Sequence, residues 1–100
     1  MALSALLLWG RSTTAQITAA DRITAARVEF RAMKLDSAAV LLRYAMDSTA
    51  APSRADLVEA WLLLGVVEFY RGNDSATASS FHQALALEPR LEASGLARYD

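Results

Sequence analysis

The sequence predicts an all-α protein, and three observations support this prediction. Apolar residues recur at steps of three and four over most of the chain, which is typical of amphipathic helices. No segment shows a sustained alternation of apolar and polar residues, so strands are not expected. Hydrophobic residues make up 54% of the 100 residues, while glycine (4) and proline (2) are scarce. This composition excludes a disordered chain and a loop-rich β fold.

Two helices are expected in the first half of the chain. The first begins at Thr18, because Asp21 stands at the spacing of a capping box. The pattern pauses at Lys34–Asp36, where Asp36 can cap the second helix. The apolar positions that would share one face are Ile23, Ala26, Phe30 and Met33 in the first helix, and Ala38, Leu41, Leu42, Ala45 and Met46 in the second.

The third helix follows a small, polar stretch, Ser48–Ser53, that suits a loop. Ser53 and Asp56 form another capping pair, and the helix that they open is expected to run to about Arg71. Its segment Leu57–Tyr70 is apolar on nearly all sides, so it must be covered on more than one side.

The fourth helix is separated from the third by a short turn. Gly72–Asn73 suits a left-handed helix end, and Asp74 or Ser75 is expected to cap the helix that follows. Pro89 ends this helix, because proline lacks the N–H group and disfavours a helical residue before it. A short fifth helix is expected over residues 91–99.

The apolar start of the chain, Met1–Trp9, has two interpretations. It is far shorter than the ~20 apolar residues of a membrane span. One interpretation is the end of an export signal, with Thr13 and Ala15 at the small positions before cleavage. This predicts an exported or periplasmic protein, although no basic residue precedes the apolar run and Arg11 follows it. The other is a terminal helix that packs on the rest of the fold, with a cytoplasmic location as the alternative.

The four helices form two pairs that resemble each other. The triplet Val28–Phe30 recurs as Val67–Phe69, and an Asp-Ser-Ala triplet at Asp36 recurs at Asp74, one position out of step with the first match. Tandem helix-turn-helix units of this kind indicate a helical solenoid. The second unit resembles a tetratricopeptide repeat (TPR), a unit of ~34 residues. The matching positions are Trp61, Leu64, Gly65, Gly72, Phe81, Ala84 and Pro89, and the departures are Glu68 in place of Tyr and Thr77 in place of Ala.

The first unit resembles the same repeat weakly, through Ala26, Ala38, Leu42 and Ala45. The resemblance implies a short α-solenoid of two TPR-like units with flanking terminal helices. The expected organisation is an N-terminal segment over 1–18, units over 19–52 and 53–91, and a capping segment over 92–100. We expect Gly65 and Ala84 to let the two helix backbones of the second unit approach, with Trp61, Leu64 and Phe81 filling the space around them.

The composition argues against catalysis. The chain has no cysteine and a single histidine, His82, so thiolate chemistry and multi-histidine metal sites are excluded. No nucleophile–base spacing and no glycine-rich phosphate loop is found, so no catalytic, metal or cofactor residues are predicted. The net charge of −1 does not favour nucleic acid. We therefore expect a non-enzymatic protein without a cofactor.

In the TPR family, partners lie in a groove lined by the first helix of each unit. The resemblance therefore implies a protein or peptide partner, with self-association as another way to cover the apolar third helix. Leu62, Leu63 and Val66 are apolar, so the carboxylate clamp known in this family is not expected. The alternative is an accessory or truncated segment of an exported envelope-assembly protein without binding activity of its own. The implied partner-binding residues are Arg27, Arg31, Glu59, Leu62, Leu63, Val66, Phe69 and Tyr70, beside Ile23, Thr24 and Phe30.

Overall fold

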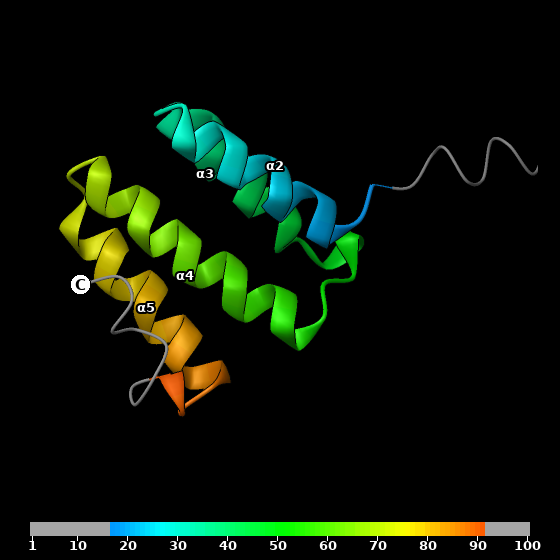
Figure 1. Cartoon of the computed structure of the whole chain (residues 1–100). Helices are drawn as coiled ribbons and strands as arrows, with labels where there is room; N and C mark the ends of the chain where they lie inside the picture. The colour runs from blue at the N-terminus through cyan, green and yellow to red at the C-terminus, as the bar shows by residue number, and fades with distance from the viewer. Residues whose placement is uncertain (1–16, 92–100) are drawn as a thin grey trace, which may run out of the picture.

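The computed structural model describes residues 17–91, which form four α-helices and no strand (Figure 1). The helices are α2 (Ala19–Arg31), α3 (Leu35–Ala45), α4 (Arg54–Tyr70) and α5 (Asp74–Leu87), with a 3₁₀ turn, η1 (Ser48–Ala50), between α3 and α4. The predicted all-α class is therefore confirmed for this part of the chain. None of these helices is long and apolar enough to cross a membrane. Residues 1–16 of the predicted N-terminal segment 1–18, and the whole predicted capping segment 92–100, lie outside the described residues.

Helices α2 and α4 begin at the predicted capping boxes. The Asp21 N–H donates to Thr18 Oγ1 at 3.0 Å, and the Thr18 N–H donates to Asp21 Oδ2 at 3.1 Å. Ser53 and Asp56 exchange the same two hydrogen bonds at 3.0 and 3.1 Å. Each box satisfies two backbone donors at a helix start, which fixes where the helix begins.

The predicted caps of α3 and α5 are wrong. Lys34 and Asn73 precede these helices, and neither makes a side-chain capping bond. Asp36, Asp74 and Ser75 lie inside the first turns instead. The reason is the tight turn before each helix, where backbone bonds to the preceding helix determine the starting residue.

The turns that close the two hairpins have the same backbone geometry. Met33 has φ 60° and Gly72 has φ 78°, both left-handed. The Met33 N–H donates to the Phe30 carbonyl at 2.9 Å, and the Gly72 N–H donates to the Phe69 carbonyl at 3.0 Å. Met33 is thus a turn residue. The prediction that it belongs to the apolar face of α2 is wrong. The two hairpins therefore correspond in the register that aligns Met33 with Gly72 and Phe30 with Phe69.

The main core lies between the α2–α3 hairpin and α4. Helix α4 packs against α2, α3 and α5, which explains why it is apolar on nearly all sides. Ala26, which corresponds to Gly65 in the register that aligns Met33 with Gly72, is fully buried. The core cluster consists of Ala19, Ile23, Ala26, Ala38, Ala39, Leu42, Ala45, Ala60, Leu63, Leu64 and Val67.

Helices α4 and α5 form one antiparallel hairpin with a close contact at its centre. A Cβ placed on Gly65 would lie 2.4 Å from Cε1 of Phe81, so the ring rests directly on the glycine. Ala84 on the facing helix is fully buried. At the far end, Arg54 Nε donates to the Leu87 carbonyl at 2.9 Å. The small residues lie at the crossing, as predicted.

The large residues of this hairpin divide between two places. Phe81 contacts Gly65, whereas Leu64 belongs to the main core and Trp61 packs partly against it. The prediction that all three residues fill the space around the Gly65 contact is therefore confirmed only for Phe81. Helix α5 ends at Leu87, and Glu88 has an extended backbone (φ −142°, ψ 88°) before Pro89. The predicted effect of this proline is therefore confirmed.

The link between the hairpins is anchored by Asp47. Its Oδ1 accepts hydrogen bonds from the Thr49 N–H at 2.9 Å and from Thr49 Oγ1 at 2.7 Å. These bonds, and to a smaller extent the charge of Arg22, hold the pKa of the Asp47 carboxyl below its ordinary value. The guanidinium of Arg22 also lies 5.4 Å from the ring centre of Tyr44, which connects α2 to the end of α3.

Candidate protein-interaction surface

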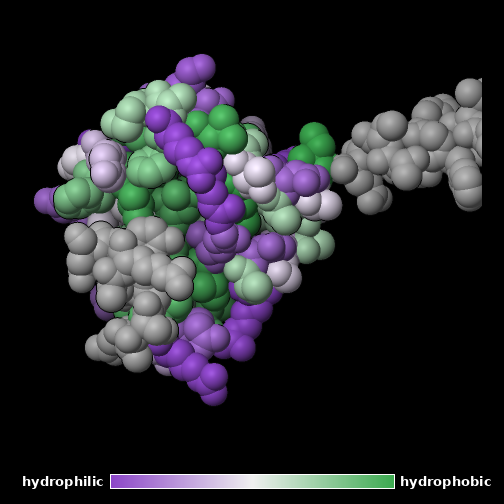
Figure 2. All heavy atoms as spheres, viewed as in Figure 1, coloured by the Kyte–Doolittle hydropathy of each residue, from purple (hydrophilic) through white to green (hydrophobic). Residues whose placement is uncertain are grey.

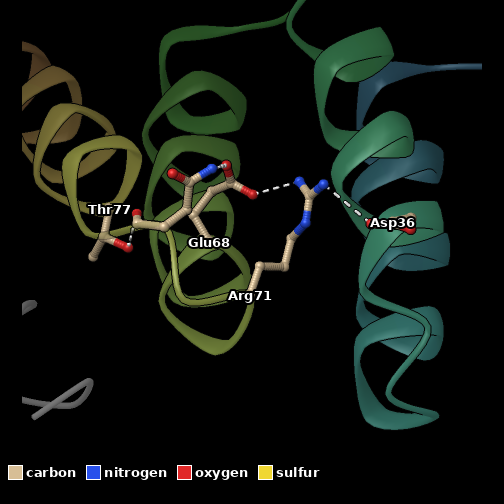
Figure 3. A network of polar contacts seen from close by, with 5 residues as sticks. Asp36, Glu68, Arg71 and Thr77 are labelled. Carbon is tan, nitrogen blue, oxygen red and sulfur yellow. Dashed lines mark hydrogen bonds and ion pairs between the residues drawn. The ribbon is translucent and has the colours of Figure 1, made fainter.

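Glu68 is a buried charge at the end of α4, and its partners explain why it is tolerated there. The side chain follows a long apolar run and is 1% exposed. Arg71 Nη1 lies 2.6 Å from Oε1, and Asn73 Nδ2 donates to Oε2 at 3.2 Å (Figure 3). A buried carboxylate with both oxygens paired avoids the cost of an isolated charge. Glu68 therefore connects the end of α4 to the α4–α5 turn.

The same network connects the two hairpins. Arg71 Nη2 lies 3.1 Å from Oδ1 of Asp36 on α3, so its guanidinium bridges a buried and an exposed carboxylate (Figure 3). Asp36, predicted as a cap, has this role instead. Phe69 and Tyr70 lie between Glu68 and Arg71 in the sequence, so the bridge fixes the stretch of backbone that carries both rings.

Three aromatic side chains form a row at this end of α2 and α4. The ring centres of Phe30 and Tyr70 are 5.3 Å apart at an interplanar angle of 89°. Those of Tyr70 and Phe69 are 5.9 Å apart at 78°. Both contacts are the edge-to-face type that aromatic rings prefer. Phe69 is 63% exposed and Tyr70 is 55% exposed, so the row reaches the surface.

The predicted charged residues are only partly free to bind a partner. Arg27 on α2 forms an ion pair with Glu59 on α4, and both side chains are partly exposed. Arg31 is exposed one turn further along α2. The hypothesis that Arg27 and Arg31 together hold an acidic group therefore needs the Arg27–Glu59 pair to open, and Arg31 is the residue that is already accessible.

The predicted apolar residues divide into core and surface. Leu62 and Leu63 are each only 8% exposed, and Leu63 belongs to the main core. Val66 is half-buried, and Phe69 and Tyr70 are exposed. Figure 2 shows hydrophobic residues across the face that carries α2 and α4, crossed by a band of hydrophilic ones. We call Phe30, Val66, Phe69 and Tyr70 the aromatic surface. Together they form the apolar part of the predicted site that reaches the surface.

Sequence reasoning missed the Glu68 network and a second feature. The i, i+3 spacing of Glu68 and Arg71 is a signal that could have identified the network. The second feature is an open depression of about 420 Å³, none of whose lining residues was predicted as part of a site; they are Glu29, Asp36, Ser37, Val40 and Leu41. Residues 17–91 contain no group of three His, Cys, Asp or Glu side chains that could hold a metal ion.

Comparisons with known proteins add no further constraint. Neither the protein-family models, nor the curated proteins, nor the solved structures gave a match to this chain.

Proposed function

We propose that this chain is a non-catalytic protein-interaction module built from two TPR-like units, which binds a protein or peptide through the aromatic surface on α2 and α4. The observation that carries the proposal is the exposure of Phe69 and Tyr70 on a rigid helix end. Large exposed apolar groups cost free energy in water, and their clustering marks an interaction site. Aromatic residues are also the side chains that contribute most to protein interfaces.

The TPR-like interpretation is supported by the positions at which the pattern places small and large residues. Gly65 lies against Phe81, which brings together the glycine position and the aromatic position of the repeat pattern. Ala26 and Ala84 are fully buried at small positions of the pattern. The matching turns at Met33 and Gly72 support a duplicated unit, which is longer than a standard repeat because of the link between α3 and α4.

Rigidity of the surface supports binding with little loss of conformational freedom. Tyr70 is held by Phe30, and the backbone of Phe69 is fixed by the bonds of Glu68 and Arg71 on either side. Because a preorganised surface loses less entropy on association, aromatic anchors of this kind favour a specific partner over transient hydrophobic contact.

The test is an affinity capture in which the immobilised chain binds its partner. Wild type is compared with variants whose substituted residues are exposed to a similar degree. Phe69→Ser and Tyr70→Ser remove exposed rings from the aromatic surface, while Val28→Ser and Val40→Ser remove exposed apolar groups elsewhere. Leu63 is unsuitable for this experiment because it belongs to the core. We expect the first two variants to lose a partner that the other two retain, with unchanged circular dichroism. Equal retention by all four variants would contradict the proposal.

A further inference from the structure

The correspondence of the two hairpins identifies a face that residues 17–91 leave uncovered. In the register that aligns Met33 with Gly72, each residue of the α2–α3 hairpin has a counterpart in the α4–α5 hairpin. The residues of α2–α3 that α4 covers therefore have counterparts on the outer face of α4–α5. Phe30 is half-buried against Tyr70, whereas its counterpart Phe69 is 63% exposed. Ala39 belongs to the core that α4 completes, whereas its counterpart Ala78 is exposed. The outer face of α4–α5 therefore has the form of a helix-binding face.

The charges on this face differ from those on its counterpart. Helix α4 is fixed on α2–α3 by two ion pairs, Arg27 with Glu59 and Asp36 with Arg71. The counterparts of Arg27 and Asp36 on the uncovered face are Val66 and Ser75, which carry no charge. Uncharged residues at these two positions suit an apolar occupant. They also suit a second copy of the chain, because these positions bring no like charges together across a twofold axis.

The opposite outer face, on α2, does not suit the same occupant. Asp21, Thr24 and Arg31 stand where α4 has Ala60, Leu63 and Tyr70, the residues that pack against the preceding hairpin. A head-to-tail stack would bury the charges of Asp21 and Arg31 against the apolar face of α4–α5, which is unfavourable. Among residues 17–91, a head-to-tail stack of copies is therefore disfavoured relative to a pairing of two α4–α5 faces.

We propose that a second copy of this chain covers the face formed by Val66, Phe69 and Ala78, with a twofold axis between the two α4–α5 hairpins. Two stacked units are fewer than the three or so that helical repeats need for stability. The dimer joins four hairpins and leaves the polar α2 faces at its two ends, where terminal repeats require polar surface. This inference rests on the proposed function, since it assigns a partner to the α4 part of the aromatic surface.

Sedimentation velocity at micromolar concentration tests the inference on the full chain. Wild type should sediment with twice its mass of 10.8 kDa. Val66→Glu should sediment as a monomer, because a charge in the paired face is left without a partner and faces its own copy. Phe69→Glu is a second variant whose exposed position keeps the fold intact if Val66→Glu does not fold. Val28→Glu is the matched control, since Val28 is 58% exposed on α2, and it should remain a dimer.

Three results would overturn the inference: a monomeric wild type, a dimer that Phe69→Glu leaves unchanged, or a species whose mass keeps growing with concentration. A monomeric wild type that still captures another protein through Phe69 and Tyr70 would overturn the dimer alone and leave the proposed function standing. Loss of both the dimer and every captured partner would count against both.

Discussion

Replacing Gly65 with alanine tests the closest helix–helix contact of the fold. The added Cβ would lie 2.4, 2.7 and 2.9 Å from Cε1, Cδ1 and Cζ of Phe81, well inside the distance at which carbon atoms attract each other. The first hairpin provides an internal comparison. There the counterparts in the aligned register are Ala26 and Leu42, both fully buried, so the corresponding helix position of the first hairpin accepts a methyl group.

The expected magnitude follows from two opposing terms. Overpacking of a close contact costs about 1–3 kcal/mol, and three short distances to one ring place Gly65→Ala toward the upper end. Alanine is a better helix former than glycine by about 1 kcal/mol, which offsets part of this cost. We therefore expect Gly65→Ala to lower the free energy of unfolding by about 1–2 kcal/mol. Each 1 kcal/mol corresponds to a fall in Tm of about 4–8 °C for a domain of this size.

A double-mutant cycle with Phe81→Leu isolates the contact. Phe81→Leu alone should cost about 1 kcal/mol through lost apolar burial. In that background the pair at the crossing becomes Ala and Leu, as in the first hairpin, so Gly65→Ala should be neutral or stabilising by up to about 1 kcal/mol. The coupling energy should be about 1–3 kcal/mol. Urea denaturation followed by far-UV circular dichroism measures all four proteins. The reasoning is refuted if Gly65→Ala stabilises the wild type, or costs the same in both backgrounds.

Further predictions concern the turns and the link. Glu68→Ala leaves the side chains of Arg71 and Asn73 without the buried carboxylate that they bind. It should lower the free energy of unfolding, measured by urea denaturation, by about 2–3 kcal/mol. Asp36→Ala, at the exposed end of the same network, should cost about 0.5 kcal/mol or less, and equal costs would refute this order. Met33→Gly should stabilise the protein by about 0.5–1 kcal/mol, because it relieves a left-handed backbone, whereas Gly72→Met should destabilise it by about 1 kcal/mol. A lower Tm for Met33→Gly or a higher Tm for Gly72→Met in differential scanning calorimetry would contradict this. Because the pKa of the Asp47 carboxyl is lowered in the folded state, its stabilising contribution is complete above the ordinary value of 3.8 and is lost as the pH falls through the lower folded-state pKa. Thermal melts below pH 3.8 should thus fall less steeply for Asp47→Asn than for wild type, and parallel curves would show that the Thr49 bonds do not stabilise the fold.

Short-range features of the fold were predictable from the sequence. The capping pairs Thr18–Asp21 and Ser53–Asp56 act over a single helical turn, so their spacing alone determines where α2 and α4 begin. The left-handed conformation at Gly72 is also a local signal. Met33 adopts the same conformation without a glycine, because the backbone bonds that close the turn impose it. The position of this turn therefore depends on the hairpin rather than on one residue type.

The site was predictable only in part, because its contacts join different hairpins. Placing Tyr70 on the surface follows from the helical repeat pattern. The contact between Tyr70 and Phe30 depends on how α4 lies across α2, which the spacing of residues within each helix does not specify. The same holds for the Arg27–Glu59 pair. Leu63 was expected in a groove but lies in the core, because α4 packs against three helices rather than one.

The most direct measurement of the central claim is photo-crosslinking from the aromatic surface. Benzoylphenylalanine replaces Phe69 with a reactive aromatic group of similar shape, and the same group at Val28 provides the exposed control. Our account predicts a discrete protein adduct from residue 69, either with a second copy or with another protein, that residue 28 does not give. The claim that this end of α2 and α4 binds a protein is contradicted if residue 69 gives no adduct, or only the adducts that residue 28 gives.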